Sequence, residues 1–469
     1  MNKQTLTFAL YFGNRGFFPG ELIAGARTEM IAAVKKAGCR ALVMEESETR
    51  YGAVETMEEG QKYAAFLKAH EGEYDGVILS LPNFGDENGA VYALRDCGVP
   101  ILIQAYPDEI GKMDFEHRRD AYCGKFSIMD VFCQYGLPFT AFEPHVAAPS
   151  GAAFAQNLRD FAAVCRIVKG MRRFTVGAIG ARTTKFMTVR FDELALQKAG
   201  ISVKSYDLSE LFARVKGMDA GRVELEEKKA YLQGYSDFSG VPANKLDTLA
   251  RTAVALDDMI AQYQLDSLSL RCWEEMQSEL GIAPCVLLGA LNDSGVAASC
   301  EMDLCNAVAM RALSLASEEP AACLDWNNNY GEDPDKCILF HCGPVARSLM
   351  EPGSGCVGNH KMFTKDGDPD CGWGCDEGRI AAMPMTYASG RTDDGKFHIY
   401  TGRGEFTGEP IEREFFGCGG VARIEGLQEK LLYIGKNGFR HHVSVTRGDW
   451  LKAVNEAFAT YLPYHLIRF

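Results

Sequence analysis

The chain has 469 residues, too many for one hydrophobic core, so we expect two or three domains. Hydrophobic residues make up 47% and charged residues 24%, which is typical of an ordinary globular protein. The net charge of −14 argues against a nucleic-acid partner, which clustered Lys and Arg would have to bind, and no apolar run approaches the roughly 20 residues that cross a bilayer.

The N-terminal sequence MNKQTLTFALYFGN leads into a strand and turn pattern without a small-residue cleavage site. We therefore interpret it as the first strand of the fold and expect a cytoplasmic protein. The 16 cysteines lie mostly in apolar runs, and a chain of this length needs no disulfide framework, so reduced thiols are expected. The densest group is Cys371-Gly-Trp-Gly-Cys375, with Cys342 and His360 upstream. It lacks paired CxxC spacing, so structural zinc is the less favoured interpretation there.

The first predicted domain covers residues 1–150 and alternates strands with amphipathic helices. Near-continuous Val, Ile and Leu runs predict a parallel sheet covered on both faces. The expected strands are 6–12, 41–44, 76–81 and 99–105, and the expected helices are 19–37, 56–69 and 87–96. Residues 82–86 and 122–127 are predicted to be ligand-binding loops.

The second predicted domain covers residues 151–318 and continues the α/β pattern. The expected strands are 174–179, 201–206 and 284–291, and the expected helices are 154–169, 192–199, 245–264 and 269–280. The turn after residue 179 carries Gly177-x-x-Gly180, which is not the GxGxxG fingerprint, so a dinucleotide site is not expected.

The third predicted domain covers residues 319–469 and has short apolar runs separated by Gly, Thr and Asp. Runs such as 384–388, 396–402 and 421–424 are typical of an antiparallel barrel or sandwich, with helices expected at 427–434 and 449–461. The predicted fold class is therefore α/β, with two doubly wound parallel-sheet domains followed by a β-rich, barrel-like C-terminal domain.

Glu301 is the first residue that points to chemistry. It opens the run SCEMDLCNAVAMRALSLA, three positions before Leu304 and seven before Val308, so we place it on the apolar face of a helix, in its first turn. A carboxylate on a buried face costs several kcal/mol unless it is paired or binds a cation. Glu301 is therefore a candidate metal ligand, although it can also simply complement the positive end of its helix.

Three further candidates end or begin apolar strands. Asp325 follows the run 321–324, His341 follows 337–340, and His441 and His442 precede an apolar run in NGFRHHVSV. Adjacent residues on a strand point to opposite faces, so only one of the paired histidines is expected to face a given site. Carboxylates and imidazoles together suit Mn²⁺, Mg²⁺ or Co²⁺ and leave room for substrate oxygens. Structural roles remain open, because a strand-end Asp is commonly a turn former and a single His commonly belongs to the core.

The segments SCE, DWNNNYGEDPDKC, LFHCG and NGFxHHV resemble the L-fucose isomerase and L-arabinose isomerase superfamily, in particular its bacterial fucose-isomerase-like branch. The resemblance covers most of the chain and is more specific in the last 200 residues. It implies a Mn²⁺ ion held by Glu301, Asp325 and His442. The arabinose branch adds a His at the position of His341, whereas the fucose branch has an Asp and lacks that His, so the fourth ligand stays open.

The resemblance also implies an activity: interconversion of an open-chain aldose and its ketose through a cis-enediol. Glu301 and Asp325 are then expected to act both as metal ligands and as the acid/base pair. The residues predicted to contact the sugar, from this subunit or a neighbouring one, are Arg182, Ser127, Lys125, Trp326, Asn327 and His441. Members of the superfamily assemble as trimers or hexamers, so a homo-oligomer is expected. Another metal-enediol enzyme, such as an aldolase or dehydratase, and a non-catalytic sugar-binding protein are the alternatives.

Overall fold

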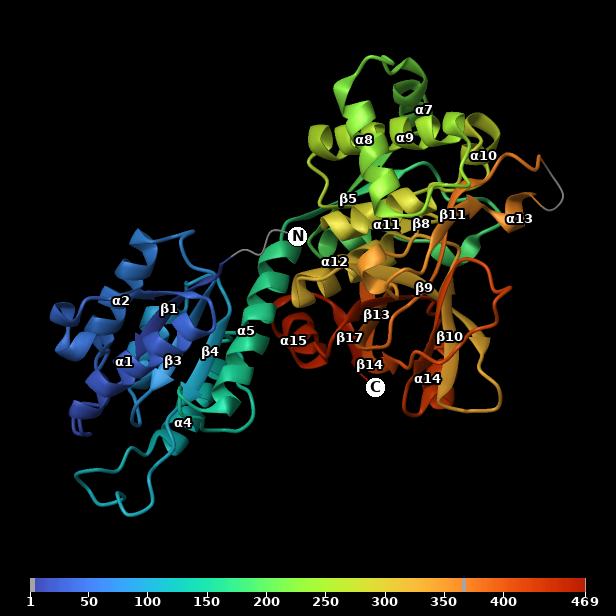
Figure 1. Cartoon of the computed structure of the whole chain (residues 1–469). Helices are drawn as coiled ribbons and strands as arrows, with labels where there is room; N and C mark the ends of the chain where they lie inside the picture. The colour runs from blue at the N-terminus through green and yellow to red at the C-terminus, as the bar shows by residue number, and fades with distance from the viewer. Residues whose placement is uncertain (1–4, 365–367, 469) are drawn as a thin grey trace. The chain divides into compact units, whose positions relative to one another are not determined.

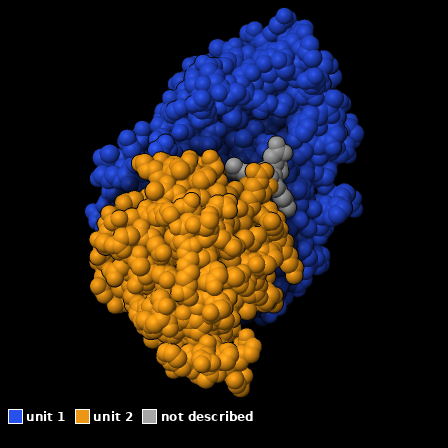
Figure 2. All heavy atoms as spheres, turned by 90° about the vertical axis from the view of Figure 1, so that its left-hand side faces the viewer, with its two compact units in different colours: residues 1, 170–469 blue, residues 2–169 orange. Residues whose placement is uncertain are grey.

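The computed structural model describes residues 5–364 and 368–468. The chain forms two compact units, the first of residues 2–169 and the second of residues 170–469 together with residue 1, which are coloured separately in Figure 2. The first unit contains one sheet and the second contains two, so each sheet falls within one of the three predicted domains (Figure 1). The predicted fold class is confirmed, while the boundaries at residues 150 and 318 stay predictions. Within the described ranges, no helix is long and apolar enough to cross a membrane.

The first unit is a four-stranded parallel sheet with the strand order β2-β1-β3-β4. Its strands are β1 (Thr7–Phe12), β2 (Arg40–Val43), β3 (Gly76–Leu81) and β4 (Ile101–Ala105). Its helices are α1 (Glu21–Lys36), α2 (Met57–Ala69), α3 (Glu87–Leu94), α4 (Ala121–Gln134) and α5 (Ala152–Met171), with short 3₁₀ turns at Glu46–Glu48 and Arg50–Gly52. The strands β3 and β4 are buried along their whole length, as expected for a sheet that helices cover on both faces.

The second sheet repeats this strand order as β6-β5-β7-β8, again all parallel. Its strands are β5 (Phe174–Ile179), β6 (Ile201–Tyr206), β7 (Ser267–Leu270) and β8 (Ala297–Cys300). Its helices are α6 (Glu193–Lys198), α7 (Leu208–Gly217), α8 (Val223–Tyr235), α9 (Ala243–Tyr263), α10 (Glu275–Leu280), α11 (Cys285–Ser294) and α12 (Leu304–Ser317), with a 3₁₀ turn at Met187–Val189.

The third sheet has nine strands, and six of them close into a barrel. The ring runs β15-β10-β9-β16-β13-β14 and returns to β15, which pairs with both β10 and β14. The strands are β9 (Ala321–Asn329), β10 (Lys336–His341), β11 (Cys356–Asn359), β12 (Trp373–Arg379), β13 (Met383–Asp393), β14 (Lys396–Phe406), β15 (Cys418–Arg423), β16 (His442–Arg447) and β17 (His465–Arg468). The helical segments are Arg347–Leu349, α13 (Lys361–Thr364), α14 (Leu427–Lys436), α15 (Leu451–Glu456) and a π-helical turn at Ala457–Tyr461.

Helix α12 joins the second sheet to the barrel. Its residues are almost all buried, and it packs against β7 and β8 on one side and against β9, β13 and β16 on the other (Figure 1). A helix that is apolar on every face is a core helix, so α12 fixes the ends of these strands relative to one another. The strands that carry Asp325 and His442 therefore meet the loop that carries Glu301.

Three predicted elements are wrong, each for a local reason. The run 284–291 forms helix α11 and not a strand, because a short, fully apolar run carries no periodicity that separates the two. The predicted helix 269–280 is the end of β7, a loop and α10. The predicted ligand loop 122–127 lies inside α4.

Candidate active site

Glu301 lies in the tight turn between β8 and α12. It precedes the helix and is not in its first turn, because Asp303 is the N-cap and the helix begins at Leu304. Glu301 and Met302 have φ values of 60° and 62°, the left-handed region that non-glycine residues seldom occupy. Such strain persists only where the surroundings hold it in place, and it is common at functional sites. Hydrogen bonds across the turn, such as Ser299 Oγ to the carbonyl oxygen of Asp303 at 2.9 Å, hold it here.

The register of the barrel brings two more candidates to the same place. His442 begins β16 and pairs directly with Asp325 on β9. His442 Nε2 lies 3.1 Å from Glu301 Oε2 and 3.3 Å from Asp325 Oδ1. The two carboxylates, 24 positions apart in the sequence, thus share one compartment with the second histidine of the pair.

The donor atoms in this compartment fit a divalent cation. Oxygen and nitrogen ligands about 2.1 Å from one ion are themselves about 3.0 to 3.4 Å apart, which matches the two distances from His442 Nε2. Across residues 5–364 and 368–468, neither Asp325 Oδ1 nor His442 Nε2 has a hydrogen-bond partner of good geometry, although both atoms are buried. Buried polar atoms are nearly always satisfied, so these two atoms are suited to binding one group in common.

Asp303 is the residue that the sequence analysis missed. Its carboxylate is fully buried and accepts a hydrogen bond from His442 Nδ1 at 2.8 Å and from Arg440 Nη1 at 2.5 Å. A carboxylate on one imidazole nitrogen directs the lone pair of the other nitrogen toward a metal. The clue in the sequence was Asp303 itself, one position before the helix run, where an N-cap is expected.

These carboxylates also set the charge of His442. Burial by itself lowers the pKa of the imidazole, but Asp303, Glu301 and Asp325 outweigh burial and raise the pKa to about 10. Burial likewise works against ionisation of Asp303, yet Arg440 and His442 hold its pKa well below the usual value. The compartment therefore concentrates negative charge that a proton or a cation must balance.

His341 lies beside this group but presents the opposite tautomer. The backbone N–H of Cys342 donates to His341 Nδ1 at 2.8 Å, so in the neutral ring the proton sits on Nε2. His341 Nε2 lies 3.1 Å from Cys300 Sγ and 4.0 Å from Glu301 Oε2. The neutral His341 ring thus presents an N–H donor toward the compartment, whereas His442 presents a lone pair there only once the proton on Nε2 has been displaced.

The edge of the compartment is partly open. The side chains of Glu301 and Asp325 are 16% and 19% exposed, whereas the imidazole of His442 is fully buried. His441 also reaches the site, with Nε2 3.5 Å from Asp325 Oδ1. The expectation that only one of the two histidines faces the site is therefore wrong, because His441 precedes β16 and strand alternation does not govern it.

Arg182 supports the site through its loop and not by reaching into it. Its guanidinium donates to the carbonyl oxygens of Thr183, Thr184 and Phe186 at 2.8, 3.0 and 3.3 Å. The folded loop places the ring of Phe186 5.8 Å from the imidazole of His442, measured between ring centres. Arg182 is therefore positioned to hold the loop that covers the histidines.

Two neighbouring residues on β9 differ in placement. Asn327 lies two positions after Asp325, where the register of β9 against β10 shifts, and is exposed. Trp326 points to the face opposite that of Asp325, where its indole N–H donates to Tyr400 Oη at 3.1 Å and its ring packs edge-on against Tyr387. The prediction that Trp326 contacts the sugar is thus not supported, because strand alternation turns its side chain into the barrel core.

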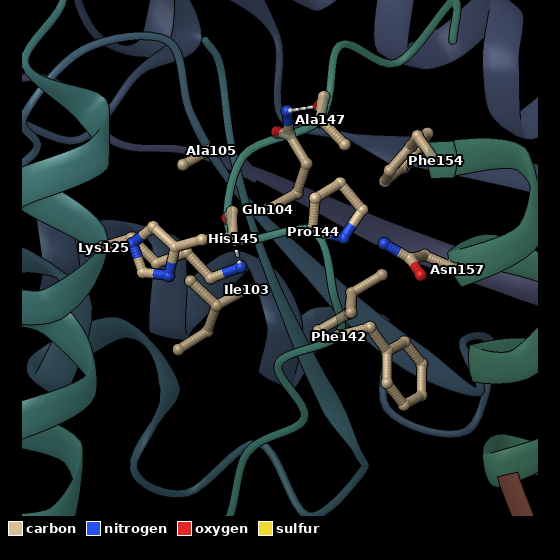
Figure 3. Close-up of a pocket in the computed structure, with 11 residues that line it drawn as sticks. Ile103, Gln104, Ala105, Lys125, Phe142, Pro144, His145, Ala147, Phe154 and Asn157 are labelled. Carbon is tan, nitrogen blue, oxygen red and sulfur yellow. Dashed lines mark hydrogen bonds between the residues drawn. The ribbon is translucent and has the colours of Figure 1, made fainter. Parts of the chain in front are cut away.

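Lys125 and Ser127 belong to the other compact unit and lie on α4. Ser127 donates to Glu87. Lys125 is buried in a pocket near the end of β4, where Nζ donates to the carbonyl oxygen of His145 at 2.8 Å (Figure 3). Burial lowers the pKa of Lys125 to about 8. Both side chains are engaged within their own unit.

Comparison with known proteins agrees with this architecture. Residues 9–172 match the family model described as "Fucose/sulfoquinovose isomerase, N-terminal domain", and residues 339–468 match "L-fucose isomerase, C-terminal domain". The chain belongs to this fucose-isomerase-like family, as its sequence motifs predicted, and it is a sugar isomerase of the aldose–ketose class.

Curated relatives lie in the same branch and are named sulfoquinovose isomerase. The protein of Alkalicoccus urumqiensis is 23% identical over 406 residues, which cover 84% of this chain and 86% of the relative. The protein of Priestia aryabhattai is 24% identical over 404 residues, or 84% and 85% of the two chains. The protein of Clostridium sp. (strain MSTE9) is 25% identical over 308 residues, or 64% and 66%.

Proposed function

We propose that this isomerase is metal-dependent, acts on a free monosaccharide and works through a cis-enediol, with Glu301, Asp325 and His442 as the metal ligands. The observation that carries the proposal is that Glu301 and Asp325 each approach His442 Nε2, at 3.1 and 3.3 Å, while Asp325 Oδ1 and His442 Nε2 lack hydrogen-bond partners among the described residues. Mn²⁺ is the first ion to test, with Co²⁺ and Mg²⁺ as alternatives, because a mixed oxygen and nitrogen site accepts all three.

A divalent cation in this site would polarise the sugar carbonyl and stabilise the negative charge that develops on O1 and O2. The chain supplies the proton transfer. Glu301 Oε2 and Asp325 Oδ1 face His442, which leaves the second oxygen of each partly exposed carboxylate for the substrate. One carboxylate takes the proton from C2 of the aldose and returns it to C1, while the O2 hydroxyl proton moves to O1.

The histidines have different roles in this mechanism. His442 keeps Nε2 unprotonated toward the metal because its Nδ1–H is held by Asp303. His341 carries its proton on Nε2 and would donate a hydrogen bond to a substrate oxygen, so we assign it as a donor and not as the fourth ligand. The exposed side chain of His441 lies at the open edge, where the tail of an open-chain sugar would extend, and the exposed Asn327, two residues after Asp325, is the next candidate to contact that tail.

The names of the relatives suggest the sugar to test first. We propose that the substrate is sulfoquinovose or a similar aldose, with L-fucose as the main alternative. We further propose that the enzyme works as a homo-oligomer. Ketose formation from a panel of aldoses should appear only after Mn²⁺ is added to chelator-treated protein. The Glu301→Gln variant should keep the fold and lose turnover by at least about a hundredfold. Full activity without a divalent metal, or in Glu301→Gln, would remove the proposed mechanism.

A further inference from the structure

A second group of ligand-type side chains lies outside the isomerase site. Its members are buried and come from four separate segments of the chain: Cys285, Cys342, Cys375 and His360. Ligand atoms of Cys285, Cys342 and His360 all lie within 4.8 Å of one another. The thiol of Cys375 borders this group of three and donates to the carbonyl oxygen of Cys342 at 2.6 Å. We call these four residues the Cys₃His cluster.

Close backbone contacts at two glycines assemble the Cys₃His cluster. A Cβ on Gly374 would lie 2.1 Å from the carbonyl oxygen of Ala283, so only glycine lets β12 approach the start of α11. A Cβ on Gly343 would lie 2.7 Å from the backbone nitrogen of Asp376, so the chain after β10 also needs glycine to pass β12. Both glycines adopt positive φ, 118° and 142°. These contacts place the thiols of residues 285, 342 and 375 together.

The same contacts explain the motif Cys371-Gly-Trp-Gly-Cys375. Its second glycine is Gly374, and the carbonyl of its first glycine, Gly372, accepts the backbone N–H of His360 at 2.9 Å. Cys371 is not part of the cluster, because its thiol points to the carbonyl of Phe363 at 3.8 Å. The motif therefore positions one cysteine and the histidine, while the other two cysteines come from α11 and the end of β10.

We propose that the Cys₃His cluster binds a structural Zn²⁺ ion in addition to the metal of the isomerase site. Cys285, Cys342 and His360 supply three ligand atoms that lie within 4.8 Å of one another, and Cys375 would turn from the carbonyl oxygen of Cys342 to become the fourth ligand. Three sulfurs and one imidazole form a common tetrahedral zinc set, in which Zn–S bonds of about 2.3 Å place two sulfurs about 3.8 Å apart. Cys285 Sγ and Cys342 Sγ are 3.9 Å apart. The His360 ring is fixed beside them by Phe363, with ring centres 4.3 Å apart. Zinc binding replaces the thiol protons, which pass to solvent.

The position of the Cys₃His cluster gives the ion a structural role. The cluster ties the start of α11, a helix that packs beside the second sheet, to strands of the barrel sheet. Cys342 directly follows His341, and its backbone N–H fixes the tautomer of that ring. A zinc ion on Cys342 would hold this segment in place, so we place it among the supports of the isomerase site and not among the groups that touch the substrate.

Metal analysis of the full chain tests the proposal. Because zinc can also enter the isomerase site, the measurement uses the Glu301→Gln variant, exposed to Zn²⁺ and then freed of loosely bound metal. We expect about one zinc per chain to remain, and X-ray absorption at the zinc edge should show sulfur neighbours at about 2.3 Å. Absence of retained zinc, or zinc with only oxygen and nitrogen neighbours, would overturn the proposal.

Cysteine variants locate the ion. Adding Cys285→Ser or Cys375→Ser to the Glu301→Gln background should lower zinc affinity at least about tenfold, whereas Cys371→Ser, which changes a thiol outside the cluster, should leave it unchanged. Equal zinc affinity in Cys285→Ser, or a Cys285–Cys342 disulfide in freshly purified protein, would count against the site. The absorption measurement needs no cysteine variant, so misfolding of one leaves the proposal testable. Mn²⁺-dependent activity of the wild-type chain is scored separately.

Discussion

Replacing Asp303 with Asn tests how the buried acid supports the isomerase site. Asp303 offers one oxygen to Arg440 and the other to His442 and Asn306, and an Asn has only one acceptor oxygen to replace the two. The Arg440 side chain is 3% exposed, so the variant leaves a cation buried without its counterion. Breaking a buried pair in this way costs about 3 to 5 kcal/mol. Loss of the acceptor on His442 should weaken metal binding about 10- to 100-fold, or about 1.4 to 2.7 kcal/mol.

Urea unfolding and Mn²⁺ titration separate the two effects. The single variant Asp303→Asn should unfold at lower urea and bind Mn²⁺ more weakly. The double variant with Arg440→Met removes both buried charges, so it should recover much of the stability while Mn²⁺ binding stays weak. Wild-type Mn²⁺ affinity in Asp303→Asn would refute the assigned role of Asp303. Equal loss of stability in the single and double variants would refute the argument about the buried pair.

Three other outcomes follow from the geometry. The pKa of His442 is raised to about 10 in the metal-free site, so below that pH Mn²⁺ must displace a proton from the imidazole. The affinity for Mn²⁺ should therefore rise by up to about tenfold per pH unit between pH 6 and 8, with one proton released on binding. A Mn²⁺ affinity that is independent of pH would contradict the assignment of His442 as a ligand. The same pKa shift stabilises the metal-free fold below about pH 6.5, and this stabilisation is lost as the pH rises through about 10. His341→Gln should keep Mn²⁺ binding but slow turnover, whereas the matched His442→Gln should lose Mn²⁺ binding. Loss of Mn²⁺ binding in both variants would show that His341 is a ligand. Trp326→Phe should cost about 1 to 2 kcal/mol of stability without changing KM, because the indole N–H of Trp326 bonds Tyr400 in the barrel. Asn327→Ala should raise KM without a loss of stability. A raised KM in Trp326→Phe would show that Trp326 contacts the substrate.

The sequence determined the elements whose residues carry a clear local pattern. Strands such as β3 and β5 have the predicted bounds, because their length, their β-branched residues and the turn residues beside them favour a strand over a helix. Glu301 and Asp325 became candidate ligands because each is a polar residue at the end of an apolar run, whereas the family resemblance selected His442 from the histidine pair. Local pattern failed for α11, whose residues are apolar on every face, and for the turn after β8, whose positive φ values no propensity reveals.

Only the tertiary structure decided which distant residues share a compartment. Asp303 caps α12, and only the barrel register places His442 and Arg440, more than 130 positions away in the chain, on its two oxygens. Trp326 and Asn327 are neighbours in sequence, yet Trp326 bonds Tyr400 in the barrel whereas Asn327 is exposed where the strand register shifts. Cys285 joins its partners because glycines in other strands permit close approach. Sequence patterns report the environment of a residue along one element, whereas contacts between elements depend on how these pack.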